Sequence, residues 1–209
     1  MSGKIRINEA LGADYGLFTW PCAPLLAQYV IYQRKYLKDK SVLEIGAGTG
    51  VPGLTAARCG AHVTLSDHHD NHHILESLRR SCDQNGLNDV KVIPLTWGCF
   101  TPSLVSLPPQ DVVLASDCLY DTKEFEDVIV TFAYLLEKNP LCEVWMTYQE
   151  RSSGRSLHHL LSRWELTLTT IPTDHLTGIS LDIDGIGSNV AISNQTIHLW
   201  KITRTTDEQ

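Results

Sequence analysis

The sequence predicts an α/β protein with a mostly parallel sheet and helices on both faces. Strand-like apolar runs alternate with helix-like segments along most of the 209 residues, which is typical of strand–helix–strand units with right-handed crossovers. The first expected strand, residues 41–45, continues into a glycine-rich turn that opens a helix. Two strand-like segments end the chain without a helical pattern between them, which predicts an antiparallel terminal pair.

The expected elements follow from apolar spacing and from the residues that start or stop helices. Pro21 suits the first turn of a helix, Gly86 suits its left-handed end, and Pro140 stops a later one. The expected helices span residues 20–36, 51–59, 71–85, 124–137 and 157–164. The expected strands span residues 41–45, 62–66, 90–95, 111–116, 143–148, 166–171 and 196–203.

Length and composition predict a single domain over residues 1–209, because 43% hydrophobic residues suffice for one core. We expect an N-terminal segment and helix (1–39), a cofactor-binding core (40–150) and a C-terminal part with a helix, a hairpin and a long loop (151–209). No run approaches the roughly 18 to 20 apolar residues of a membrane span, and the polar N-terminus does not resemble a secretory signal. Six cysteines occur singly, without a C-x-x-C pair, which favours a reducing compartment.

The formal net charge of −7 disfavours direct binding of duplex nucleic acid and favours a basic partner. Acidic residues gather after the fourth expected strand, and two interpretations stay open. They stabilise a helix N-terminus by a few tenths to about 1 kcal/mol each, or they attract a basic segment through a focused negative field. The residues concerned are Asp117, Asp121, Glu124, Glu126 and Asp127.

The glycine-rich turn follows the first expected strand and predicts a cofactor site. Gly46, Gly48 and Gly50 let the backbone approach a ligand, and the next helix directs its free N–H groups there. A dinucleotide site would need a third glycine at Val51, and Glu44 would repel a pyrophosphate. A carboxylate suits a ligand with a cationic end instead, such as S-adenosylmethionine; the alternative is an ordinary turn without a ligand.

The ends of the next strands supply further candidates, because ligands of such sheets bind at the carboxyl ends of strands. Asp67 lies about twenty residues after the glycines, where an acid accepts hydrogen bonds from ribose hydroxyls; it could also cap the next helix. Trp97 offers a flat indole for an adenine, or fills the core. After Ser116, a carboxylate at Asp117 would hold a cationic acceptor nitrogen and orient it, or form a turn.

Together these motifs resemble the seven-strand methyltransferases of the lysine-methyltransferase-like family, over nearly the whole chain. The resemblance is carried by Glu44-Ile-Gly-Ala-Gly-Thr-Gly, Asp67, Thr96-Trp97-Gly98, Asp117-x-x-Tyr120 and the segment from Tyr15 to Pro21. It implies a Rossmann-like class I fold, with a seven-stranded sheet, an antiparallel C-terminal hairpin and S-adenosylmethionine as cofactor. It also implies site residues: Trp20, Glu44, Gly46, Gly48, Gly50, Asp67, Trp97 and Ser116 for the cofactor, and Asp117 with Tyr120 for the transferred methyl group and the acceptor.

The resemblance further implies methylation of a protein side chain. Its nearest branch implies histone arginine and a nuclear role, so we expect a basic protein segment as partner and a nuclear and cytoplasmic location. Two carboxylates suit a planar guanidinium, and Asp117, Asp121 and Glu124 are the candidates. Lysine of a non-histone protein is the second choice. A small-molecule or nucleic-acid methyltransferase and a catalytically silent cofactor-binding protein stay as alternatives; we expect no membrane contact and a monomer.

Two segments leave alternatives open. His68 and His72, like His69 and His73, have the i, i+4 spacing of a metal pair on a helix, but no further ligand pattern accompanies them. We therefore expect a solvated helix start and no metal. The loop over residues 173–195 is long and glycine-rich, so it is either a lid over the substrate or a disordered spacer.

Overall fold

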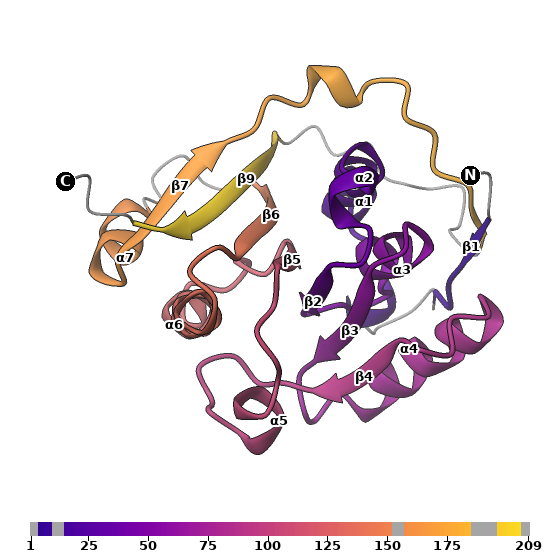
Figure 1. The fold of residues 1–209 in the computed structure, drawn as a ribbon, viewed down its shortest axis with the longest axis horizontal. Coiled ribbons are helices and arrows are strands. Elements are labelled where there is room, and N and C mark those ends of the chain that lie inside the picture. The colour runs from indigo at the N-terminus through magenta and orange to yellow at the C-terminus, as the bar shows by residue number, and fades with distance from the viewer. Residues whose placement is uncertain (1–3, 10–14, 152–156, 185–195, 206–209) are drawn as a thin grey trace.

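The computed structural model describes residues 4–9, 15–151, 157–184 and 196–205. They form a seven-stranded sheet in the order β4-β3-β2-β5-β6-β9-β7 (Figure 1). Strand β9 runs antiparallel to β6 and β7, and the other four pairings are parallel, as predicted. The strands are β2 (Ser41–Ile45), β3 (His62–Asp67), β4 (Lys91–Pro94), β5 (Val112–Ser116), β6 (Glu143–Gln149), β7 (Leu166–Thr170) and β9 (Ile197–Arg204).

Helices cover both faces of the sheet, because the buried strands alternate apolar side chains between two cores. In β2, Val42 packs with α1 and α3, whereas Leu43 and Ile45 pack with α6. One face carries α1 (Cys22–Tyr32), α2 (Arg34–Leu37), α3 (Val51–Arg58) and α4 (His72–Gln84). The other carries α5 (Pro102–Val105), α6 (Phe125–Lys138) and α7 (His158–Arg163). The helix predicted over residues 20–36 is thus divided at Gln33.

The strand order places the candidate site at the switch point of the sheet. From β2 the chain adds β3 and then β4 on one side, and β5 and then β6 on the other. Ile45 at the end of β2 is paired with Ala115 near the end of β5. The loops that follow these two strands therefore open at the position where ligands of doubly wound sheets bind.

The first part of the loop after β7 lies against the body of the protein. Residues 171–184 pass over α1 and reach the N-terminal strand (Figure 1), where β8 (Ile183–Asp184) pairs in parallel with β1 (Ile5–Arg6). Gln28 Nε2 donates to the Ile179 carbonyl at 3.0 Å, and Leu176 is buried. This part is packed against α1, while residues 185–195 of the expected lid or spacer lie outside the described residues.

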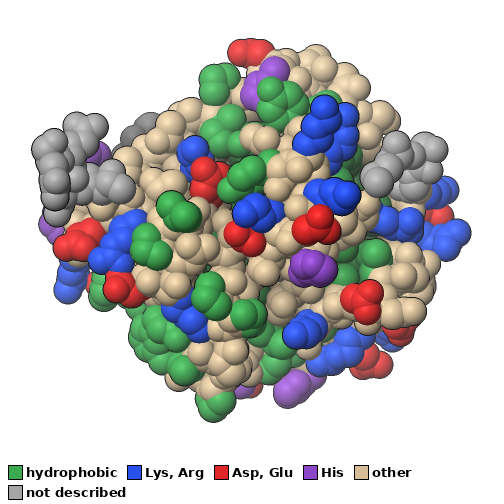
Figure 2. All heavy atoms as spheres, in the orientation of Figure 1, with side chains coloured by type: hydrophobic (Ala, Val, Ile, Leu, Met, Phe, Trp, Pro, Cys, Tyr) green, Lys and Arg blue, Asp and Glu red, His purple; other side chains and the backbone are tan. Residues whose placement is uncertain are grey.

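No helix among the described residues is long and apolar enough to cross a membrane. Figure 2 shows acidic and basic side chains next to one another on the face that it draws. The net charge of −7 therefore does not produce a uniformly negative surface on this face.

Candidate active site

The three glycines after β2 adopt the conformation for which glycine is favoured. Gly46, Gly48 and Gly50 have φ values of 56°, 53° and 76°. A Cβ on Gly46 would lie 2.8 Å from Trp97 Cζ2, and one on Gly48 would lie 3.0 Å from the Gly16 carbonyl oxygen. The loop is therefore enclosed by the N-terminal segment and by the turn after β4, and it leaves no room for side chains.

Asp67 ends β3 and connects the glycine loop to the start of α4. Its Oδ2 accepts the Gly48 N–H, and its Oδ1 accepts the His68 N–H and an N–H of the Asn71 side chain, each at 2.9 Å. All three donors are neutral, and a carboxylate accepts about four hydrogen bonds. The buried carboxylate thus keeps capacity for a further donor, while its predicted contact with a ribose stays a prediction.

The setting of Glu44 differs from the expected one. Its side chain is fully buried beneath α3, where Oε2 accepts the Gly53 N–H at 2.9 Å and Oε1 has no partner among the described residues. Burial raises the pKa of this carboxyl to about 8. The side chain of Glu44 points to the α3 face of β2, so it supports the loop from below; the geometry does not favour direct contact with a cationic cofactor group.

Trp97 and Tyr120 form the aromatic part of the site. Their ring centroids lie 6.2 Å apart at an interplanar angle of 63°. Thr131 Oγ1 of α6 accepts the Gly98 N–H at 2.9 Å and so fixes the turn that carries Trp97. Tyr120 is 51% exposed. Partial burial and the Glu124 carboxylate raise the pKa of its phenol to about 12, so it is protonated at neutral pH.

Asp117 follows β5 with a φ of 56° and is held by an arginine that sequence reasoning did not assign to the site. Arg151 Nη1 lies 2.9 Å from Oδ1, and Nη2 lies 2.5 Å from Oδ2. Only 6% of the Asp117 side chain is exposed, against 27% for Arg151. The available signal was the position of Arg151 shortly after an expected strand, because side chains at the carboxyl ends of parallel strands line ligand sites.

The start of α1 lies beside Asp117. The Cys22 carbonyl accepts Thr147 Oγ1 at 3.0 Å, and the Thr147 carbonyl accepts the Asp117 N–H at 2.8 Å. Trp20, two residues earlier, is 38% exposed and packs edge-on against Phe18, with centroids 5.1 Å apart. The structure thus brings the predicted residue Trp20 to the same end of the sheet as Asp117.

Most of the acidic residues after β5 already have partners within the chain. Asp121 accepts the backbone N–H of Lys123 at 3.0 Å, Glu126 pairs with Arg163 at 2.9 Å, and Asp127 packs against the turn at Gly98. Glu124 differs, because its Oε2 is buried without a hydrogen-bond partner among the described residues. Asp117, which pairs with Arg151, and Glu124, which interacts with Tyr120, are the two acids that we consider for an acceptor.

The histidines after Asp67 do not form a metal pair on a helix. His68, His69 and Asp70 lie in an exposed turn, and α4 begins only at His72. His69 Nδ1 lies 2.7 Å from Thr96 Oγ1, and its Nε2 lies 3.0 Å from Asp70. The predicted solvated helix start is therefore nearer the observed geometry than the i, i+4 pairs.

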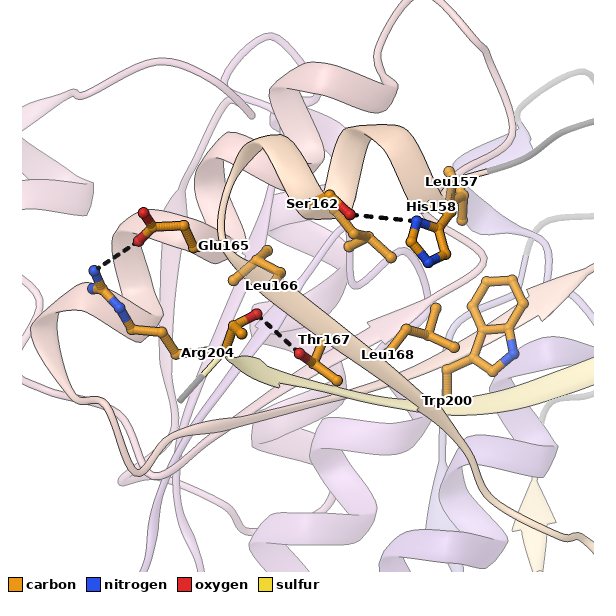
Figure 3. A pocket seen from close by; sticks show the side chains of 11 residues that line it. Leu157, His158, Ser162, Glu165, Leu166, Thr167, Leu168, Trp200 and Arg204 are labelled. Carbon is orange, nitrogen blue, oxygen red and sulfur yellow. Dashed lines mark hydrogen bonds and ion pairs between the residues drawn. The ribbon is translucent and has the colours of Figure 1, made fainter. Parts of the chain in front are cut away.

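A cavity of about 760 Å³ lies at the β7 edge of the sheet (Figure 3). It is enclosed by α7, β7 and β9, and its lining includes Leu157, Leu168 and Trp200. None of the predicted site residues lines it. We therefore place the candidate active site at the carboxyl ends of β2, β3 and β5.

Comparisons with known proteins identify the family to which the chain belongs. The model of the lysine methyltransferase family matches residues 1–162. Histone-arginine methyltransferase METTL23 of Xenopus laevis is 48% identical over 200 residues, covering 96% of this chain and 84% of that protein. Its namesake in Homo sapiens is 41% identical, covering 91% and 99%. Protein-lysine methyltransferase METTL21E of Bos taurus is 34% identical, covering 65% and 48%.

The resemblance to methyltransferase-like protein 23 was also visible in the sequence. It is carried by Trp20-Pro-Cys-Ala, by residues 107–117, by Lys138-Asn-Pro and by Thr147-Tyr-Gln-x-Arg151-Ser. The identities to proteins of that name confirm it.

Solved structures confirm the methyltransferase fold. The ribosomal protein L11 methylase of Lactobacillus delbrueckii subsp. bulgaricus has a TM-score of 0.60 at 16% identity, covering 97% of this chain and 86% of that one. A Burkholderia thailandensis 1,6-didemethyltoxoflavin-N1-methyltransferase, solved with S-adenosylhomocysteine, has a TM-score of 0.55 at 16% identity, covering 90% and 79%. The fold is thus the predicted Rossmann-like methyltransferase fold.

The cofactor is S-adenosylmethionine, and the residues present fit it. The glycines bring bare backbone to the end of β2, where a Cβ would clash at Gly46. Asp67 supplies a buried acceptor for hydroxyl groups, and Trp97 supplies an aromatic surface. The individual roles of Trp20, Ser116 and these residues toward the cofactor stay predictions.

Proposed function

We propose that this chain, a member of the lysine methyltransferase family and an S-adenosylmethionine-dependent protein methyltransferase, methylates arginine. The arginine would lie in a basic protein segment, and histones are the first candidate. The observation that carries the proposal is the pairing at Asp117. Both oxygens of this buried carboxylate receive both terminal nitrogens of a guanidinium. The site therefore accommodates the planar fork of an arginine, which a lysine ammonium does not present.

In the proposed reaction, Asp117 and Tyr120 hold and orient the acceptor nitrogen. When bound, S-adenosylmethionine would supply the methyl group: an N–C bond would form as the S–C bond breaks, S-adenosylhomocysteine would leave, and the acceptor nitrogen would release one proton to a carboxylate of the site or to solvent. Asp117 would bind the guanidinium and align it, and the protonated Tyr120 would lie next to the acceptor, in contact with Trp97. Glu124, with its unpartnered Oε2, is the second carboxylate available to the acceptor.

The names of relatives support the proposal in part and define its competitor. Two relatives that align with nearly the whole chain are named histone-arginine methyltransferases. The family model and a more distant relative are named for lysine. Lysine of a non-histone protein is therefore the second candidate. We further propose a monomer that acts in nucleus and cytoplasm without direct contact with nucleic acid.

The test is transfer from isotope-labelled S-adenosylmethionine to core histones, with the labelled residue located by mass spectrometry. The proposal predicts labelled methylarginine. Label on lysine alone would favour the second candidate and contradict the first. Label in RNA or metabolites, with none in protein, would contradict both. A calorimetric titration with S-adenosylhomocysteine checks that the protein used binds its cofactor product.

A further inference from the structure

Arg151 occupies the carboxylate to which the proposed function assigns the acceptor. Its guanidinium covers both oxygens of Asp117, and Nη1 also donates to the Gln149 carbonyl at 3.3 Å. The Gln149 N–H approaches Oδ1 at 3.3 Å from the protein side. The two carboxylate oxygens of Asp117 that an acceptor guanidinium would bind are thus already bound to Arg151.

Exposure shows from which side this pair is reached. The Arg151 side chain is 27% exposed and that of Asp117 is 6% exposed. The arginine therefore lies between the carboxylate and solvent, at the end of β6, while Asp117 is enclosed by Thr147 and the start of α1. An acceptor that enters from solvent meets Arg151 before it meets Asp117.

We propose that Arg151 is an internal occupant of the acceptor site, and that a substrate arginine must displace its guanidinium from Asp117 before methyl transfer. The proposal rests on the proposed function, because it identifies Asp117 as the acceptor's binding group. One carboxylate cannot give its bidentate edge to two guanidinium groups at once. Arg151 also neutralises the charge of Asp117, so a second cation that approaches the intact pair is only weakly attracted.

Displacement makes Arg151 a determinant of specificity. An incoming guanidinium replaces the lost contacts one for one, with two parallel N–H···O bonds for two. A lysine ammonium is a point charge and restores fewer of them. The ion pair therefore raises the KM for every cationic acceptor, and raises it more for lysine than for arginine.

The alternative is that Arg151 stays in place and positions Asp117. The two roles give opposite kinetics. Removal of an occupant exposes Asp117 and lowers the KM for the acceptor, whereas removal of a positioning residue lowers kcat and does not lower KM.

The experiment compares wild type, Arg151→Gln and Arg151→Lys in steady-state transfer to a histone peptide. The proposal predicts a KM at least several-fold below that of wild type for Arg151→Gln, and an intermediate KM for Arg151→Lys, because lysine keeps the charge but loses the fork. Arg80→Gln is the matched control, since Arg80 is exposed on α4 and, in the described part of the chain, forms a surface pair with Glu76 at 4.0 Å. Its KM should equal that of wild type.

Folding is checked by thermal unfolding and by the affinity for S-adenosylhomocysteine. If Arg151→Gln does not fold, Arg151→Lys decides by the same criterion. An unchanged or higher KM with a tenfold lower kcat, in a folded variant, would overturn the proposal. The KM values of the variants and of wild type are compared for a peptide that carries the residue type, arginine or lysine, that wild type methylates. Methylation of lysine alone would thus overturn the proposed acceptor, while the KM ratio would still decide the role of Arg151.

Discussion

Asp67 and Asp117 are two buried carboxylates at neighbouring strand ends, and they differ in what holds them. Each is 7% exposed, at the end of β3 and just after β5 respectively. Asp67 is held by neutral N–H groups alone, whereas Asp117 is held by the guanidinium of Arg151. A neutral hydroxyl can join the first without displacing a charge. A cation reaches the second only by exchange.

The two halves of the site also differ in how they are assembled. The half around Asp67 consists of β2, β3 and the glycine loop between β2 and α3, with Trp97 closing it from the end of β4. The half around Asp117 needs β5, β6, the start of α1 and Arg151 to meet. The half to which we assign the cofactor is thus built mainly from consecutive segments of the chain, whereas the half to which we assign the acceptor depends on contacts between distant segments.

The largest expected effect is on the acceptor half, for Asp117→Asn. Asparagine tolerates the left-handed backbone at this position, so the change removes mainly the charge. Loss of a buried charge-assisted pair costs about 3 to 4 kcal/mol, and we expect kcat/KM for the protein acceptor to fall about 10²- to 10³-fold. Affinity for S-adenosylhomocysteine should change less than about twofold. The measurement is steady-state transfer with a calorimetric titration.

Asp121→Asn is the matched control for that variant. Asp121 is exposed, and its Oδ1 accepts the Lys123 N–H at 3.0 Å within its own turn. Its kcat/KM should equal that of wild type. Equal losses in both variants would contradict the assignment of the acceptor to Asp117.

The next effect concerns the cofactor half, for Asp67→Ala. Hydrogen bonds to a charged group contribute about 1.5 to 3 kcal/mol, so we expect Kd for S-adenosylhomocysteine to rise about 10- to 100-fold. Transfer should recover at high cofactor concentration, with the KM for the acceptor unchanged. Asp70→Ala, which alters an exposed neighbour, should bind as wild type does. An unchanged Kd for Asp67→Ala would show that Asp67 does not contribute to cofactor binding.

A difference in stability between two glycine variants measures how closely the two halves fit. Gly46→Ala places a Cβ 2.8 Å from Trp97 and 3.2 Å from Cys118 Sγ, at a φ of 56°. Gly86→Ala meets the same kind of backbone strain, at 65°, but nothing within 4 Å. Each should lose about 1 to 2 kcal/mol from the backbone, and Gly46→Ala should lose a further 1 to 3 kcal/mol from overpacking. Denaturant unfolding of both variants gives the difference; equal losses would contradict the tight packing at Gly46.

The smallest effect concerns pH and Glu44. Its folded pKa of about 8 lies above the ordinary 4.5, so folding favours the protonated carboxyl. The stability it contributes is complete below pH 4.5 and is lost as pH rises toward 8, by at most about 1.4 kcal/mol per pH unit. Glu44→Gln still accepts the Gly53 N–H and lacks this loss. The free energy of unfolding of wild type should therefore fall by about 1 kcal/mol more than that of the variant between pH 6 and 7. Urea unfolding measures it, and parallel pH curves for the two proteins would contradict the raised pKa of Glu44.

Local sequence signals were sufficient for most of the fold and for the glycine turn after β2. Alternating strands and helices, and the glycines after β2, depend on neighbours in the chain, and β2 was predicted with its observed bounds. The pairing of β1 with β8 was missed, because each strand has two residues and they join distant ends of the chain.

The side-chain partners could not be predicted in the same way. The direction of Glu44 depends on the packing of α3 over β2, which places the Gly53 N–H against its carboxyl. The pairing of Asp117 with Arg151 joins positions 34 apart in the sequence and depends on the alignment of β5 with β6. The sequence likewise did not indicate which of the acidic residues after β5 would pair with other residues of the same chain.

The most direct test of the division between the two carboxylates is a set of calorimetric titrations on wild type, Asp67→Ala and Asp117→Asn. Each protein is titrated with S-adenosylhomocysteine and, separately, with an arginine-containing histone peptide in the presence of saturating S-adenosylhomocysteine. We predict that Asp67→Ala weakens only the binding of S-adenosylhomocysteine and that Asp117→Asn weakens only the binding of the peptide. Loss of both ligands in either folded variant, or of neither in both, would contradict the account.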